Sequence, residues 1–267
     1  MRDGTPRPFL FGTNFKMHQT PAESMGFYRE LATASLVPEG CRLFMIPPFT
    51  SLAAVTDLAR RDPAGIWIGA QNMHWAERGA YTGEISAAML VALGVDLVLL
   101  GHAERRGLFH ETDADLNKKV LAALSAGLRV LLCVGETAEE RAFGVGSETV
   151  ARQVKIALDG IEPAAIPMLQ VAYEPVWSIG EGGVPAHPED VAPLAALIRA
   201  NLLDRLGRTG ATVPVLYGGS VNPDNAGTFA SVEGIDGLFV GRAAWTVEGY
   251  RETLKAALTG LKSPRDM

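Results

Sequence analysis

Three ionisable side chains of different types directly follow apolar runs of the sequence. Lys16 comes after the first run, His102 after the fourth, and Glu174 closes the sixth. Removing a proton from a carbon beside a carbonyl needs a base, together with a donor and a cation that stabilise the negative charge developing on oxygen. A glutamate, an imidazole and an ammonium group supply these functions. The set is therefore suited to the enolisation of a small carbonyl compound.

Taken singly, each of these residue types has a simpler interpretation. A lysine or glutamate is most often a solvated surface charge, and a histidine most often has a structural role. Glu174 differs because its neighbours Tyr173, Pro175 and Trp177 are apolar. Such a setting removes water from a carboxylate and makes it a stronger base toward carbon acids. Glu174 is thus the candidate base.

The other candidates for the reacting end of a substrate are polar residues at the ends of the first and fourth apolar runs. His102 is the candidate electrophile and Lys16 the candidate stabilising cation. Asn14 and Glu104 stand two residues from them and are candidate supporting groups. Independent surface charges have no reason to gather at such positions, so their shared placement predicts a common site.

Glycine-bearing turns follow the sixth, seventh and eighth apolar runs. They contain Gly180, Ser220 and the pair Gly241 and Arg242. Glycine lets backbone N–H groups approach an anion closely, although a single glycine after a strand is ordinary turn chemistry. Together the turns predict a phosphate site. Arg242 would face solvent, bind phosphate directly, or pair with Glu181.

The elements that must position these residues alternate along the chain. Eight short runs rich in Val, Ile, Leu and Phe are each followed by helical spacing, which predicts a buried parallel sheet covered by helices. The runs lie near residues 9–13, 42–46, 66–70, 97–101, 130–134, 169–173, 213–217 and 237–241. Periodicity alone leaves open a closed barrel or an open doubly wound sheet. Only a barrel brings every strand's C-terminal end to one face, so the candidate residues favour a (β/α)₈ TIM barrel.

Helix boundaries support this count of elements. Residues 20–23 combine an N-cap threonine, a first-turn proline and a glutamate, and residues 222–223 (Asn-Pro) predict a second helix start of the same kind. Gly127 and Gly207 suit helix ends. No linker or change of composition marks a domain boundary, so we expect one domain over residues 1–267, with residues 1–8 as a short polar tail.

Bulk composition narrows the class of partner. The chain has 267 residues, and its 24 basic and 30 acidic residues give a formal charge of −6. That balance argues against nucleic acid and anionic membranes as partners and favours a small molecule. Cys41 and Cys133 each lie within an apolar run, which suits buried thiols in the cytoplasm and not a disulfide. No export signal or membrane span is expected.

Neither a metal nor another cofactor is expected. The five histidines and two cysteines show no paired ligand spacing such as HExxH or CxxC. An isomerisation also transfers no net electrons. The predicted chemistry therefore depends on side chains alone.

Seven short segments, in a consistent order, carry a resemblance to a known family. They are residues 12–17 (GTNFKM), 69–72 (GAQN), 81–84 (YTGE), 101–106 (GHAERR), 133–136 (CVGE), 172–177 (AYEPVW) and 217–222 (YGGSVN). From about Phe11 to Trp245 the chain resembles triosephosphate isomerase. The resemblance implies that Glu174 is the base, that His102 is a neutral imidazole polarising the carbonyl, and that Lys16 and Asn14 contact the substrate.

The same resemblance implies a lid and a dimer. Residues 175–185 would close over the enediol intermediate and keep water out, which prevents loss of phosphate. The family forms homodimers in which a threonine-bearing loop reaches the neighbouring site, and Thr82 matches that threonine. We therefore expect a homodimer.

Departures from the family pattern concern the phosphate end and the wall beside the base. Arg242 stands where a second phosphate-binding glycine is usual, and the lid reads GEGGVP. Phe15 replaces a usual tryptophan, Ala103 a serine, and Phe239 a leucine. Segments such as 237–245 (GLFVGRAAW) resemble the family's erythrulose-phosphate branch. That resemblance implies interconversion of L-erythrulose 1-phosphate and D-erythrulose 4-phosphate, with triosephosphate isomerisation and a non-catalytic sugar-phosphate-binding barrel as alternatives.

Overall fold

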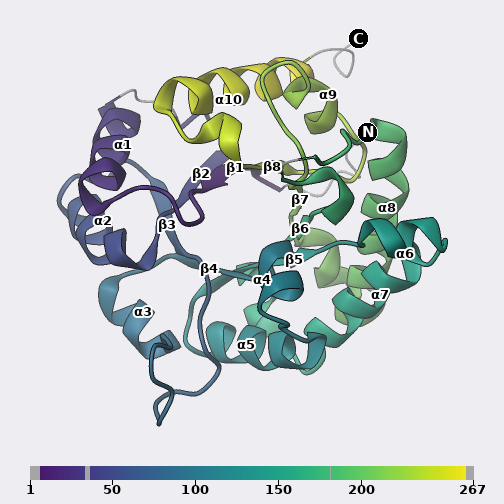
Figure 1. The fold of residues 1–267 in the computed structure, drawn as a ribbon, viewed down its shortest axis with the longest axis horizontal. Coiled ribbons are helices and arrows are strands. Elements are labelled where there is room, and N and C mark those ends of the chain that lie inside the picture. The colour runs from purple at the N-terminus through teal and green to yellow at the C-terminus, as the bar shows by residue number, and fades with distance from the viewer. Residues whose placement is uncertain (1–6, 34–36, 181, 263–267) are drawn as a thin grey trace.

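The computed structural model describes residues 7–33, 37–180 and 182–262, and within them eight parallel strands close into a barrel (Figure 1). Each strand pairs with its neighbours in sequence order, and β1 also pairs with β8. The strands are β1 (Phe9–Asn14), β2 (Cys41–Ile46), β3 (Ile66–Ala70), β4 (Leu97–Leu100), β5 (Arg129–Val134), β6 (Leu169–Tyr173), β7 (Val215–Tyr217) and β8 (Gly237–Val240). The predicted TIM barrel is confirmed, and the open-sheet alternative is wrong.

Helices surround the strands as an outer ring (Figure 1). The α-helices are α1 (Pro21–Thr33), α2 (Phe49–Arg61), α3 (Ala87–Leu93), α4 (Ala103–Leu108), α5 (Asp113–Ser125), α6 (Ala138–Ala142), α7 (Gly146–Ala157), α8 (Pro188–Leu206), α9 (Ala226–Ala230) and α10 (Val247–Lys262). Short 3₁₀ turns are η1 (Pro163–Met168), η2 (Val176–Ser178), η3 (Gly207–Thr212) and η4 (Arg242–Ala244). None of the helices in the described part of the chain has the length and apolar character to cross a membrane.

Strand boundaries differ from the predicted ones by two residues at most, for local reasons. The strand β7 begins at Val215 and not at Val213, because Pro214 has no N–H to donate to the ladder. The strand β4 ends at Leu100 because Gly101 has a φ of +74°, a left-handed conformation that breaks the extended chain.

Most predicted helix boundaries are also confirmed. Thr20 and Glu23 exchange hydrogen bonds at the start of α1, and Gly127 follows α5 with a φ of +80°. The start predicted at Asn222 is wrong, since α9 begins at Ala226. The Asn222 side chain instead accepts hydrogen bonds from the backbone N–H groups of residues 224 and 225, which satisfies those donors in a turn.

Apolar side chains fill the barrel interior as well as the space between strands and helices. Phe44, Leu131, Leu216 and Phe239 belong to the inner cluster. A side chain at Gly12 would begin 2.3 Å from the Phe44 ring, so this strand position requires glycine. Cys41 and Cys133 are both buried and are not joined by a disulfide.

The segment before β1 is attached to the barrel. Residues 1–6 of the predicted tail lie outside the described residues, but Arg7 is buried and its Nε is 2.9 Å from Asp236 Oδ1. Asp236 also pairs with Arg199. These contacts lie before β1 and β8, at the barrel face opposite the strand ends that carry the candidate residues, and that face commonly serves stability.

Candidate active site

The three candidate catalytic side chains meet at the C-terminal ends of β1, β4 and β6. Lys16 Nζ lies 2.7 Å from Glu104 Oε1, and Glu104 Oε2 lies 3.6 Å from His102 Nδ1. His102 Nε2 in turn lies 3.6 Å from Glu174 Oε1. The predicted base, electrophile and cation therefore share one site, as the barrel topology requires.

His102 is the N-cap residue of α4, and this position sets its chemistry. Its Nδ1 accepts a hydrogen bond from the backbone N–H of Glu104 at 3.2 Å. An Nδ1 that accepts carries no proton, so the ring proton lies on Nε2, the nitrogen that faces Glu174. The geometry thus presents a neutral N–H donor to the site.

Glu174 is the first residue after β6, and its carboxylate is buried with an exposed fraction of 2 %. Its Oε2 accepts a hydrogen bond from the backbone N–H of Ala103 at 3.2 Å. Burial raises the pKa of the neighbouring Cys133 thiol well above its usual value, and the Glu174 charge adds to this effect. A buried carboxylate with little hydration is well suited to take a proton from carbon.

Lys16 is held by its own backbone and not only by its ammonium group. Its φ is +52°, an uncommon value for a residue with a side chain. The Lys16 N–H donates to Asn14 Oδ1 at 2.8 Å, and the Lys16 carbonyl accepts from Gln71 Nε2 at 2.7 Å. Strain of this kind persists where surrounding contacts fix the conformation, and it is frequent at active sites.

A hollow of about 730 Å³ opens beside these groups, and three glycine-bearing turns line it. Its lining includes the predicted phosphate residues Gly180, Ser220, Gly241 and Arg242, together with Lys16. The expectation that the turns after β6, β7 and β8 converge is confirmed. Arg242 is exposed at the rim of this hollow, and its suggested partner Glu181 lies outside the described residues.

The turn after β7 connects the hollow to the base. A side chain at Gly218 would begin 3.0 Å from Glu174 Cγ and 3.4 Å from Phe239 Cδ1, so base and aromatic ring meet at this glycine. At Gly219 an added Cβ would lie 2.2 Å from the Tyr217 hydroxyl. The Gly219 position therefore requires glycine for steric reasons, whereas a side chain at Gly218 would displace its neighbours by a few tenths of an ångström.

Two further residues near the site, Ser178 at the start of the lid and Glu136 just after β5, were not predicted from the sequence. Ser178 lines the hollow, and its Oγ accepts a hydrogen bond from Ser220 N at 3.4 Å. Glu136 accepts hydrogen bonds from Trp177 Nε1 at 2.6 Å and from the Tyr173 hydroxyl at 3.0 Å. The position of Glu136 just after β5 was a usable signal, because strand ends face the site. Ser178 offered none, since its role depends on a contact across the barrel mouth.

Thr82 is the one predicted site residue that does not join the site within this chain. It lies in an exposed segment between β3 and α3, a part of the chain that extends away from the barrel (Figure 1). Nothing in this placement tests the expected role of Thr82 in a dimer.

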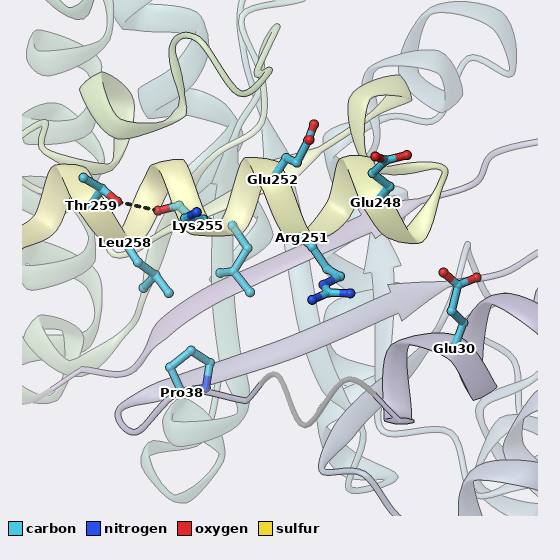
Figure 2. Close-up of a pocket in the computed structure, with 9 residues that line it drawn as sticks. Glu30, Pro38, Glu248, Arg251, Glu252, Lys255, Leu258 and Thr259 are labelled. Atoms are coloured by element: carbon cyan, nitrogen blue, oxygen red, sulfur yellow. Dashed lines mark hydrogen bonds between the residues drawn. The ribbon is translucent and has the colours of Figure 1, made fainter.

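A second hollow, of about 850 Å³, lies on the outside of the barrel between α1 and α10 (Figure 2). Glu30, Glu248 and Glu252 mix there with Arg251 and Lys255. Because its charges are of both signs and none of the strand-end candidates lines it, this hollow is unrelated to the chemistry above.

Comparison with known proteins agrees with this geometry. The chain is 42% identical to an L-erythrulose-1-phosphate isomerase of Rhizobium rhizogenes, over 97% of each chain, and 44% identical to one of Rhizobium etli, over 95% of each chain. It is also 42% identical to a triosephosphate isomerase of Carboxydothermus hydrogenoformans, over 94% of this chain and 99% of the other.

A crystal structure of triosephosphate isomerase from Bartonella henselae matches the fold with a TM-score of 0.82. That chain is 35% identical, and the match covers 92% of this chain and 98% of the other. The family model for triosephosphate isomerase matches residues 9–257. The chain therefore belongs to the triosephosphate isomerase family and is a sugar-phosphate isomerase of that type.

Proposed function

We propose that this isomerase interconverts L-erythrulose 1-phosphate and D-erythrulose 4-phosphate. The observation that carries the choice of substrate is Arg242, which lines the hollow beside Ser220 and Gly241. A guanidinium there offers a phosphate two parallel N–H donors, which shifts where the phosphate binds and so where the carbon chain lies. The two Rhizobium relatives are L-erythrulose-1-phosphate isomerases, which supports the same choice.

In the proposed reaction Glu174 takes the proton from the hydroxyl-bearing carbon beside the ketone. The electron pair of that C–H bond forms the double bond of a 2,3-enediolate, whose negative oxygen is stabilised by the His102 Nε2–H and by Lys16. Glu174 then returns the proton to the former carbonyl carbon. A hydroxyl proton moves from one oxygen to the other through His102, and no atom or electron is gained or lost.

Phosphate would be bound by the backbone and side chains of Gly180, Ser220, Gly241 and Arg242. Asn14 and Glu104 support the reaction by holding Lys16, through the Asn14 hydrogen bond and the Glu104 ion pair. The cofactor-free proton transfer needs the lid to keep water from the intermediate.

Triosephosphate isomerisation is the second candidate. The triosephosphate isomerase of Carboxydothermus hydrogenoformans has the same 42% identity as one of the erythrulose-phosphate isomerases, and the base and electrophile serve either substrate. The two reactions differ in the space that the substrate needs, because the tetrulose phosphate has one more hydroxymethyl group than the triose phosphate.

The deciding experiment compares the two substrates with purified protein. We expect kcat/KM for L-erythrulose 1-phosphate to exceed that for dihydroxyacetone phosphate by about 100-fold, the order of discrimination that one additional substrate group gives in a binding pocket. The Arg242→Gly variant should narrow this ratio by raising KM for the tetrulose phosphate. Equal or reversed specificity constants would favour the triose reaction. Absence of solvent deuterium in either recovered ketose phosphate would favour a non-catalytic binding protein.

We also propose a cytoplasmic homodimer. Tyr81 and Thr82 are exposed on the segment between β3 and α3. Met17, in the loop after β1, has an exposed fraction of 96 %. Thr82 matches the threonine of the family's dimer loop, and its exposure leaves it accessible to a partner subunit. Light scattering coupled to size-exclusion chromatography should give twice the chain mass, and a single-chain mass would contradict the proposal.

A further inference from the structure

Trp245 connects the end of β8 to the loop that carries Lys16. Its indole Nε1 donates a hydrogen bond to the backbone carbonyl of Asn14 at 2.9 Å. The same indole packs against the His18 ring, with 4.3 Å between ring centroids. Residues before and after Lys16 are therefore both in contact with one tryptophan side chain.

Fixing Asn14 also fixes Lys16. The Asn14 side chain accepts the Lys16 N–H at 2.8 Å, and Gln71 holds the Lys16 carbonyl. The backbone of Lys16 lies in the left-handed region, with a φ of +52°, so contacts are needed to keep it there. The Trp245 hydrogen bond supplies the contact on the β1 side of this strained residue.

The other end of the connection is the phosphate side of the hollow. Trp245 N donates to the Arg242 carbonyl at 3.2 Å, which closes the η4 turn, and both residues line the hollow. One short turn thus relates the position of Arg242 to that of Lys16. A substrate whose phosphate lies near Arg242 would find the Lys16 ammonium at a fixed distance.

We propose that Trp245 is a positioning residue for catalysis, because its indole N–H fixes Asn14 and through it the ammonium group of Lys16. This inference rests on the proposed function, in which Lys16 stabilises the enediolate. Trp245 itself touches no reacting atom. Its effect is on geometry, and misplacement of a catalytic group by about 1 Å is enough to slow a reaction by about 100-fold.

The test uses Trp245→Phe, which keeps an aromatic ring against His18 but removes the N–H. The matched control is Trp67→Phe, because Trp67 lies on β3 against Arg129, near the start of the strand and away from the site. We expect kcat to fall about 10-fold in the Trp245 variant with KM changed less than about threefold, and both constants to be unchanged in the control.

A double-mutant cycle separates positioning from a general structural role. In a Lys16→Met background, Trp245→Phe should lower kcat by less than about twofold, because there is no ammonium left to misplace. Equal losses in the two backgrounds would overturn the proposal. So would a Trp245→Phe variant with wild-type kcat, or one whose loss of activity is accompanied by a matching loss of thermal stability.

A readout without substrate keeps this inference distinguishable from the proposed function. In the spectrum of ¹⁵N-labelled wild-type protein, the Trp245 indole N–H is the signal that the Trp245→Phe variant lacks. This N–H should exchange slowly with solvent, as a hydrogen-bonded donor does. A wild-type protein that turns over neither sugar phosphate would refute the proposed function, on which the catalytic role of Trp245 rests, while slow exchange would still show the Trp245 hydrogen bond. Fast exchange of the Trp245 indole would refute the positioning contact alone.

Discussion

His102 Nε2 lies 3.6 Å from Glu174 Oε1, and the two side chains come from the ends of different strands of the barrel. His102 is the N-cap of helix α4, and the first residue of that helix, Ala103, donates its N–H to the same carboxylate. The base and its partner imidazole are therefore both held by backbone N–H groups at the start of α4.

Replacing Glu174 with glutamine should remove the base while preserving the shape of the side chain. We expect kcat to fall by about 10³-fold, within the range typical of general-base catalysis. Steady-state rates and deuterium uptake from solvent measure the loss. The control is Glu77→Gln, a residue whose side chain is 75% exposed, and a Glu174→Gln variant with near wild-type exchange would show that another group removes the proton.

Replacing Glu104 with glutamine should affect activity more than stability. The side chain of Glu104 is 44% exposed and pairs with Lys16, so its loss should change the free energy of unfolding by less than about 1 kcal/mol. The ammonium and the imidazole nevertheless lose their common partner, and we expect kcat/KM to fall about 10-fold. Urea unfolding and kinetics on the same preparation provide the comparison, and a large stability loss with intact kinetics would contradict it.

Gly135→Ala should disturb the backbone that carries the base. An added Cβ would lie 1.8 Å from the Glu174 carbonyl oxygen, a distance that forces β5 and β6 apart. We expect a destabilisation of about 2 to 3 kcal/mol and a loss of activity. The control Gly26→Ala has no neighbour within 4 Å in helix α1, and it should stabilise the protein by about 0.5 to 1 kcal/mol.

The thiol of Cys133 should resist alkylation in the folded protein. Burial raises its pKa well above the usual value, and the adjacent Glu174 charge raises it further. Because the thiolate is the reactive form, a raised pKa leaves the group protonated and unreactive at pH 8. Mass spectrometry after iodoacetamide treatment should find Cys133 unmodified in native protein and modified in urea, whereas rapid labelling of native protein would contradict its burial.

The order of elements was already determined by the sequence. Eight apolar runs alternating with helical spacing predicted each strand to within two residues, because strands buried on both faces leave a continuous hydrophobic signal. Where an observed strand boundary differs from the predicted one, the cause is a local property of the backbone, as at Pro214 and Gly101. The helix start at Asn222 was wrong because an asparagine that can cap a helix can equally satisfy the donors of a turn.

The chemical identity of the site could also be read from the sequence, since Lys16, His102 and Glu174 each stand at a strand end. What only the tertiary structure decided is how they are held. The neutral tautomer of His102 follows from one backbone N–H, and the position of Lys16 follows from contacts with Gln71 and, through Asn14, with Trp245. Hydrogen bonds between residues far apart in sequence leave no periodic or local signal, because they exist only once barrel closure has brought the strand ends together.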